Sequence, residues 1–238
     1  PHTLGMTLLT SHQSQPSSPA ATKPVATVHA QLCISFTKVN NVMDTRHPLR
    51  SVTGGLEGAV LEVLAGTTEV LPLKDVHTLV GSASKSGVRK ALLRLVDNGV
   101  VDTAPGGYRL NRDHLACNAI VELANLRSTL YSRIADEIKK WKASIDVAGV
   151  FGSVARKDGD ANSDIDLLIV GEKIPANAIG NLAHTVERLT GNNCHIVVLS
   201  KKEFRIALRR GEPIVKAWRR DLVVLCGNRN VFTTPAVG

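Results

Sequence analysis

The sequence predicts an α/β (α+β) protein with two folded parts joined by a long helix, and three patterns support this prediction. Residues 51–113 contain three short stretches with the apolar spacing of helices, followed by a hairpin. Residues 114–144 carry one long helical pattern, and residues 145–238 alternate apolar strand-like runs with helices. A chain of 238 residues with 43% hydrophobic residues can build two small cores.

The first segment, residues 1–50, is predicted to be a disordered extension. Residues 11–28 are rich in Ser, Pro, Thr and Ala and show no sustained apolar periodicity. Such a composition buries too little apolar surface to offset the entropy of ordering the chain. Met43, just upstream of the folded pattern, is a candidate start of the native chain.

Residues 51–113 are predicted to hold three helices and a hairpin. The first two helices span 56–64 and 73–81, and Ser84 or Ser86 caps the third. The third helix has a predicted core face formed by Val88, Ala91, Leu92, Leu95 and Val96. Residues 104–107, Ala-Pro-Gly-Gly, have strong turn chemistry and join two short strands.

This order of elements resembles the winged-helix DNA-binding domain. The resemblance implies that the third helix enters the major groove of double-stranded DNA and that the hairpin touches the backbone. The candidate DNA-binding residues are basic side chains on the third helix and the hairpin: Lys85, Arg89, Lys90, Arg94 and Arg109. The alternative is that these residues form an ordinary solvated helix face.

Residues 114–144 are predicted to form one connecting helix. Its apolar residues recur every three or four positions and form a single stripe: Leu123, Leu126, Leu130, Ile134, Ile138 and Trp141. The stripe either pairs with its copy in a homodimer or packs against one of the two folded parts.

In residues 145–238, a small-residue loop follows a buried strand. The apolar run 147–151 leads directly into Gly152 and Ser153, and Arg156 follows in a short helical turn. A Gly-Ser pair lets the backbone approach a ligand closely, and a guanidinium suits phosphate oxygens. We therefore predict nucleotide binding by Gly152, Ser153 and Arg156, together with Ser163 in the following loop.

Two carboxylates begin the next strand. Asp164 and Asp166 occupy alternate positions, so both side chains point to one face, while Ile165, Leu167 and Ile169 take the opposite face and can enter a core. Neighbouring carboxylates repel each other, and a bound Mg²⁺ (or Mn²⁺) compensates that repulsion. The alternative is a strand end with two solvated aspartates.

Gly152-Ser153 with Asp164-x-Asp166 resembles the signature of the DNA polymerase beta-type nucleotidyltransferase superfamily, especially its minimal members. The resemblance covers roughly residues 145–200. It implies a small mixed sheet and transfer of a nucleoside monophosphate from an NTP, with ATP the expected one. It also implies metal binding by the paired aspartates. The acceptor is expected to be a protein, a small molecule or a nucleic-acid end. Some minimal members are antitoxins that modify a partner toxin, so a toxin is a candidate partner.

The chain departs from this pattern at one position. Active members carry a third carboxylate on the strand after the next helix, and residues 194–199 contain neither Asp nor Glu. His195 lies near that place and is either a general base or a strand-end residue without a role. Asp221, on a predicted strand at 221–225, is a second candidate for the missing third carboxylate.

Composition favours a polyanionic partner and a reducing cytoplasm. The net charge is +8, and much of the excess lies in a C-terminal basic stretch. That stretch comprises Lys201, Lys202, Arg205, Arg209, Arg210, Lys216, Arg219 and Arg220. The four cysteines, Cys33, Cys117, Cys194 and Cys226, show no metal or redox spacing, and no segment predicts a membrane span.

Two functional hypotheses follow from these patterns. The first is a metal-dependent nucleotidyltransferase that carries a DNA-binding domain. The second is a DNA-binding transcriptional regulator whose nucleotidyltransferase-like domain senses a nucleotide without turning it over. The intact Gly-Ser and Asp-x-Asp motifs favour the first hypothesis, and the missing third carboxylate favours the second.

Overall fold

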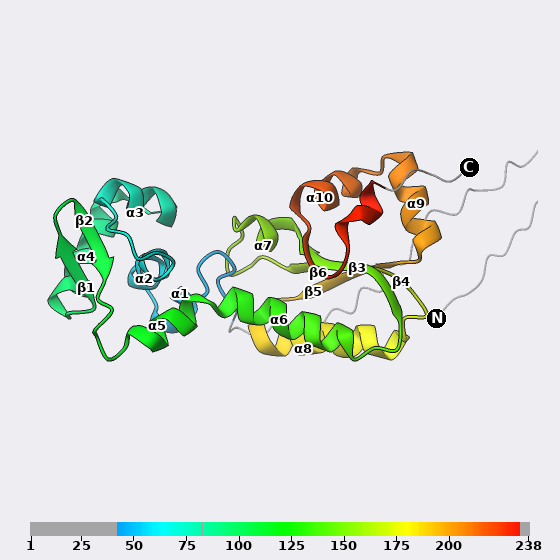
Figure 1. The fold of residues 1–238 in the computed structure, drawn as a ribbon, viewed down its shortest axis with the longest axis horizontal. Coiled ribbons are helices and arrows are strands. Elements are labelled where there is room, and N and C mark those ends of the chain that lie inside the picture. The colour runs from blue at the N-terminus through cyan, green and yellow to red at the C-terminus, as the bar shows by residue number, and fades with distance from the viewer. Residues whose placement is uncertain (1–41, 82, 234–238) are drawn as a thin grey trace, which may run out of the picture.

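A computed structural model describes residues 42–81 and 83–233 (Figure 1). The predicted disorder of residues 11–28 and the position of Cys33 lie outside the described residues. The described chain has an N-terminal part of helices and one hairpin, and a C-terminal part built on a sheet. The predicted mixed α/β architecture with a small mixed sheet is confirmed.

The N-terminal part begins with four helices and ends with a hairpin. Its elements are α1 (Arg50–Thr53), α2 (Glu57–Ala65), α3 (Leu73–Val80), α4 (Lys85–Asp97), β1 (Val101–Ala104) and β2 (Gly107–Leu110). Ser84 caps α4, because its hydroxyl accepts a hydrogen bond from the amide of Gly87 at 3.1 Å. Val88, Ala91, Leu92 and Leu95 on α4 are buried, so the predicted core face is confirmed, with Val96 partly buried beside it.

The hairpin is tied to the link between α2 and α3. Pro105 and Gly106 form its two-residue turn, and Gly106 has φ +95°, a conformation that favours glycine. Leu71 pairs with Tyr108 through two backbone hydrogen bonds of 2.9 Å. A Cβ on Gly107 would lie 2.1 Å from the carbonyl oxygen of Leu71, so only glycine allows this close approach.

The predicted connecting helix at 114–144 is two helices, α5 (Cys117–Ala124) and α6 (Leu126–Lys139). The chain leaves the helical conformation at Asn125, where φ is −92° and ψ is 9°. The break divides the apolar stripe, because Leu123 packs against the N-terminal core and Ile134 packs against the sheet. Leu130, Ile134 and Ile138 of the stripe are buried, and Leu123, Leu126 and Trp141 are partly buried. Pairing of the stripe in a homodimer stays a prediction.

The C-terminal part contains a four-stranded sheet in the order β5-β4-β3-β6. The strands are β3 (Ser144–Phe151), β4 (Ile165–Glu172), β5 (Cys194–Leu199) and β6 (Val223–Gly227), and only β4 and β5 are parallel. The remaining elements are α7 (Gly152–Arg156), α8 (Ala176–Thr190), α9 (Lys201–Arg210), α10 (Pro213–Asp221) and η1 (Arg229–Phe232).

Helices cover both faces of this sheet (Figure 1). On one face, α6 and α8 pack against Ile165, Leu167 and Ile169 of β4. On the other face, α9 and α10 pack against Leu168 and Val170 of the same strand. Because successive side chains of a strand point to opposite faces, Asp164 and Asp166 lie on the same face as Leu168.

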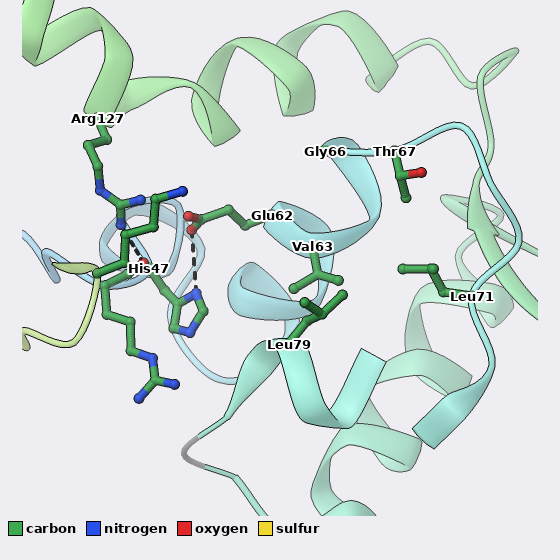
Figure 2. A pocket seen from close by; sticks show the side chains of 10 residues that line it. His47, Glu62, Val63, Gly66, Thr67, Leu71, Leu79 and Arg127 are labelled. Atoms are coloured by element: carbon green, nitrogen blue, oxygen red, sulfur yellow. Dashed lines mark hydrogen bonds and ion pairs between the residues drawn. The ribbon is translucent and has the colours of Figure 1, made fainter. Parts of the chain in front are cut away.

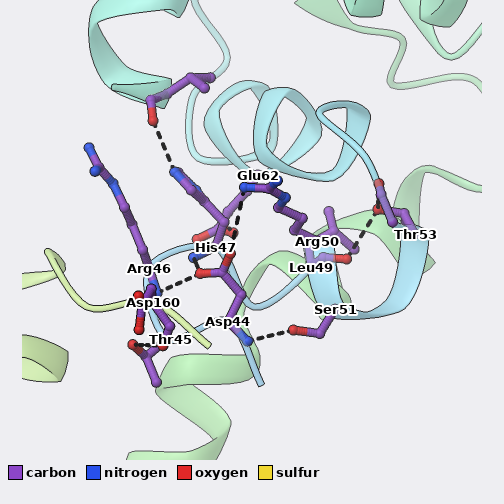
Figure 3. A network of polar contacts seen from close by, with 12 residues as sticks. Asp44, Thr45, Arg46, His47, Leu49, Arg50, Ser51, Thr53, Glu62 and Asp160 are labelled. Carbon is purple, nitrogen blue, oxygen red and sulfur yellow. Dashed lines mark hydrogen bonds and ion pairs between the residues drawn. The ribbon is translucent and has the colours of Figure 1, made fainter. Parts of the chain in front are cut away.

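The prediction that residues 1–50 are a disordered extension is wrong for residues 42–50, which pack between the two parts (Figure 3). Thr45 is fully buried, and its hydroxyl donates to the carbonyl oxygen of Asp160 at 3.0 Å. His47 Nε2 donates to the carbonyl oxygen of Val80 at 3.1 Å. Asp44 shapes the turn by accepting hydrogen bonds from the amides of Arg46 and His47.

Cys117, Cys194 and Cys226 are free thiols, and the first two are buried. Among residues 42–81 and 83–233, no helix is both long enough and apolar enough to cross a bilayer.

Candidate functional site

The loop after β3 lies directly against Asp166, the first carboxylate of β4. Phe151, the last residue of β3, pairs with Asp166, and Gly152 then turns the chain into α7 with φ +76°. A Cβ on Gly152 would lie 2.5 Å from Oδ2 of Asp166. The backbone conformation favours glycine, and a Cβ at this position would have to displace the Asp166 carboxylate.

Asp164, Asp166 and His195 meet at the start of β4 and β5. His195 pairs in register with Asp166 on the parallel strand. Its Nδ1 lies 3.7 Å from Oδ2 of Asp164 and 3.7 Å from Oδ1 of Asp166. All three side chains are between 31% and 45% exposed, so they line an accessible site. The two aspartates thus face the same side, as the alternation of a strand predicts.

Burial raises the pKa of the Asp166 carboxyl, and the neighbouring Asp164 raises it further. His195 and Arg156 act in the opposite direction, because positive charge favours the ionised carboxylate. Asp164 is positioned by Asn193, whose Nδ2 donates to its Oδ1 at 3.0 Å. The carboxylate pair, Asp164 and Asp166, is therefore held together at an electrostatic cost that a cation would relieve.

The carboxylate pair fits a divalent ion that is shared with a substrate. Among residues 42–81 and 83–233, no group of three or more His, Cys, Asp or Glu side chains is arranged to hold a metal ion. Mg²⁺ is usually bound by one or two carboxylates together with phosphate oxygens and waters. Two neighbouring carboxylates beside a loop that admits close backbone approach suit that type of binding.

Arg156 lies close to the site but is held by two other carboxylates. Its Nε donates to Asp158 at 2.9 Å, and its Nη1 donates to Asp221 at 2.8 Å. These hydrogen bonds raise the pKa of the guanidinium above its ordinary value. Phosphate binding by Arg156 stays a prediction, and two of its nitrogens already have acidic partners.

Asp221 anchors Arg156 and does not join the carboxylate pair. It is the last residue of α10, whereas the predicted strand at 221–225 begins only at Val223. Its side chain is 1% exposed and forms ion pairs with Arg156 and Arg220. The hydrogen bonds from Arg220, with those from Arg156, lower the pKa of Asp221 to about 2.

The two predicted serines differ in their surroundings. Ser163 accepts a hydrogen bond from the amide of Asp160 and donates to its carboxylate, so it shapes the loop before β4. Ser153 lies half-buried in the first turn of α7, next to Gly152. Nucleotide binding by both residues stays a prediction.

Sequence reasoning missed Asn192, which is 2% exposed and fixes the loop before the carboxylate pair. Its Nδ2 donates to the carbonyl oxygens of Met43, Ala161 and Ser163 at 3.1–3.2 Å. These partners lie up to 149 residues away in the sequence, so no local pattern indicates the role.

The predicted DNA-binding residues lie in the N-terminal part, away from the carboxylate pair. Lys85, Arg89 and Lys90 are exposed on α4. Arg94 forms an ion pair with Glu57, and Arg109 lies 3.5 Å from Asp102 across the hairpin. These two arginines are therefore partly neutralised within the chain.

Comparison with protein families identifies the C-terminal part. The family described as "Polymerase beta, Nucleotidyltransferase" matches residues 133–216, which include α7, the carboxylate pair and His195. Residues 133–216 form a nucleotidyltransferase-family domain. The match also takes in the end of α6, which precedes the predicted domain start at residue 145. A search of curated proteins found no match to the chain.

Two solved structures show limited similarity to the chain. A crystal structure of a toxin-antitoxin with AMP-PNP is 15% identical, with a TM-score of 0.32, covering 43% of this chain and 77% of that chain. A "putative nucleotidyltransferase" from Sulfolobus solfataricus is 23% identical, with a TM-score of 0.25, covering 40% of this chain and 76% of that chain.

The clash at Gly152 predicts the effect of a single methyl group in the nucleotidyltransferase domain. Gly152→Ala should lower the free energy of unfolding by at least about 1 kcal/mol more than Gly211→Ala does. Gly211 is the matched control, because it has φ +62° but open space around its Cβ position. Urea unfolding measures both values, and equal losses would mean that Asp166 does not constrain position 152.

The ion pairs of Asp221 predict a pH-dependent stability. Because its folded pKa is depressed, the stabilisation is fully present above the ordinary carboxyl pKa of about 4 and is lost as pH falls through about 2. Asp221→Asn should cost about 1–3 kcal/mol at pH 7.

Urea unfolding of the wild type and of Asp221→Asn, measured from neutral to acidic pH, tests whether the stabilisation by Asp221 is lost as the pH falls. The difference between the two free energies of unfolding should shrink as the pH is lowered. Asp158→Asn is the control, because Asp158 contacts the same arginine but its side chain is 54% exposed. A difference that stays constant with pH would contradict the assigned ion pairs.

Proposed function

We propose that the nucleotidyltransferase domain transfers a nucleoside monophosphate from an NTP to an acceptor hydroxyl, with Mg²⁺ or Mn²⁺ as cofactor. One observation carries this proposal. Asp164 and Asp166 lie within 3.7 Å of the same ring nitrogen of His195, directly beside a loop whose Gly152 leaves no room for a side chain.

Each part of this site has a role suited to its chemistry. Gly152 and Ser153 offer backbone and hydroxyl groups to the triphosphate at the start of α7. Asp164 and Asp166 would hold the divalent ion, which neutralises phosphate charge and orients the groups that react. Arg156 adds positive charge nearby, while Asp221 fixes its position.

His195 is the proposed general base. Its Nδ1 faces both carboxylates, and this favours the tautomer that keeps the proton on Nδ1 and leaves Nε2 unprotonated. In the reaction, the acceptor oxygen bonds to the α-phosphorus, pyrophosphate leaves, and the hydroxyl proton passes to Nε2 of His195.

A second function is favoured by one specific observation. Strand β5 has His195 beside Asp166, and this strand contains no carboxylate. A domain that binds a nucleotide without turnover would then act as the sensor of a DNA-binding regulator. This function and the proposed enzyme differ in whether the nucleotide is transferred.

Incubation with each α-labelled NTP, a divalent ion and cell extract tests the enzyme. We expect label transfer, and a loss of at least about 100-fold in Asp164→Asn, Asp166→Asn and His195→Ala. Asp136→Asn is the control, because Asp136 lies on α6, is 64% exposed and is not part of the candidate site. Metal-dependent NTP binding without transfer to any acceptor would favour the regulator instead.

The N-terminal part is proposed to be a winged-helix domain that binds double-stranded DNA. Helices α2, α3 and α4 follow the short α1 and precede a hairpin, and the exposed basic residues Lys85, Arg89 and Lys90 lie on α4, the last helix before it. Contacts of such residues with phosphates supply affinity that depends strongly on salt. A transcriptional role for the protein would follow from this binding.

The double variant Arg89→Ala/Lys90→Ala should weaken duplex binding. The slope of log K against log salt should become shallower by about 2, since two phosphate contacts are lost. Fluorescence anisotropy over a range of salt concentrations measures this slope. Lys139→Ala/Lys140→Ala is the charge-matched control at the C-terminal end of α6, and an equal effect of the two double variants would contradict the assignment of α4.

A further inference from the structure

A groove lies at the junction of the two parts, and none of the residues assigned to nucleotide or DNA binding lines it (Figure 2). We call it the junction groove. It has a volume of about 520 Å³, in the range of small-molecule sites. Its walls come from α2, the end of α3, the segment 46–47, the start of α6 and Lys157 after α7.

One wall of the junction groove is basic. Arg46, Arg127 and Lys157 line it, and Glu62 is the one carboxylate among the lining residues. Within the described ranges, 42–81 and 83–233, Arg46 and Lys157 form no ion pair. Arg127 is fixed, because its Nη2 donates to the carbonyl oxygens of Thr45 and Arg46 at 2.7 and 2.6 Å. Positive charge therefore exceeds negative charge in the groove.

Polar atoms behind this wall have unused hydrogen-bonding capacity. The His47 side chain is 8% exposed, and its Nε2 donates to Val80. Its Nδ1 lies 3.7 Å from Oε2 of Glu62, which is too long for a hydrogen bond. His47 Nδ1, Glu62 Oε2 and Arg127 Nε are all buried without a hydrogen-bond partner in the described structure. Figure 2 shows these three side chains gathered at one end.

The other wall is apolar. Val63 and Leu71 are partly buried there, and Leu79 is 56% exposed although it is a large hydrophobic residue. Figure 2 places Leu71 at the end opposite Arg127, with Val63 and Leu79 between. An apolar surface next to a cluster of cations suits a molecule that has both kinds of group.

We propose that the junction groove binds a small organic anion with an apolar body and a carboxylate or phosphate group. The anionic group lies against Arg46, Arg127 and Lys157, and the apolar body covers Leu79 and Val63. The ligand contacts both parts of the chain at once. Lys157 directly follows Arg156, the last residue of α7, so the bound anion lies next to the helix that begins at Gly152.

Isothermal titration calorimetry with naphthyl phosphate tests the proposal. Naphthoate replaces phosphate by carboxylate, naphthol lacks the charge, and inorganic phosphate lacks the apolar body. Naphthyl phosphate or naphthoate should bind at least about tenfold more tightly than both naphthol and inorganic phosphate. The tighter of the two identifies the anionic group.

Variants locate the binding in the junction groove. Leu79→Ser and Arg46→Gln/Lys157→Gln should each raise the dissociation constant at least about fivefold. Leu115→Ser and Lys202→Gln are matched controls outside the groove, and Leu115 is 99% exposed. Asp166→Asn, in the nucleotide site, should leave the dissociation constant within about twofold.

Three results would overturn the proposal. The first is the absence of saturable binding by either anion, and the second is equal binding of naphthol, which would indicate a purely apolar surface. The third is loss of binding in Asp166→Asn or in the control variants, which would place the anion elsewhere. None of these results depends on whether the protein transfers nucleotides.

Discussion

The close approach of Gly152 to Asp166 is the constraint on which the candidate site depends. Pairing of β3 with β4 brings the end of one strand beside the start of the other, and a glycine with positive φ keeps that space open. The pairing of β4 with β5 then adds His195 to the same place. The strand register thus brings together two carboxylates, a ring nitrogen and the backbone at Gly152.

The site also depends on contacts that cross the whole chain. Asn192 fixes Met43 and the loop before Asp164, and Thr45 holds the carbonyl of Asp160. The segment that makes these contacts also carries His47, which reaches the end of α3. The N-terminal and C-terminal parts are therefore connected next to the loop that precedes Asp164, and the junction groove lies at that connection.

Local patterns predicted most elements, because the signals of helices and strands are short-range. The cap at Ser84, the core face of α4, the strand at 194–199 and the common face of Asp164 and Asp166 could all be read from neighbouring residues. The ion pair between Arg156 and Asp221 could not, because 65 residues separate the partners.

Other failures have the same cause. The break at Asn125 interrupts an apolar stripe that looks continuous in sequence, since its two halves pack on different cores. The segment around Thr45 and His47 lacks periodicity and is ordered by distant partners. Sequence patterns thus predicted the carboxylate pair but missed what holds it in place.

The most direct test is whether a divalent ion and a nucleotide meet at the carboxylate pair. Nuclear magnetic resonance with Mn²⁺ and ATP added at substoichiometric levels measures which signals the paramagnetic ion broadens. The signals of Gly152 and the His195 ring should broaden first, and Asp166→Asn should abolish the effect. Broadening that spares both residues while ATP is bound would contradict the site.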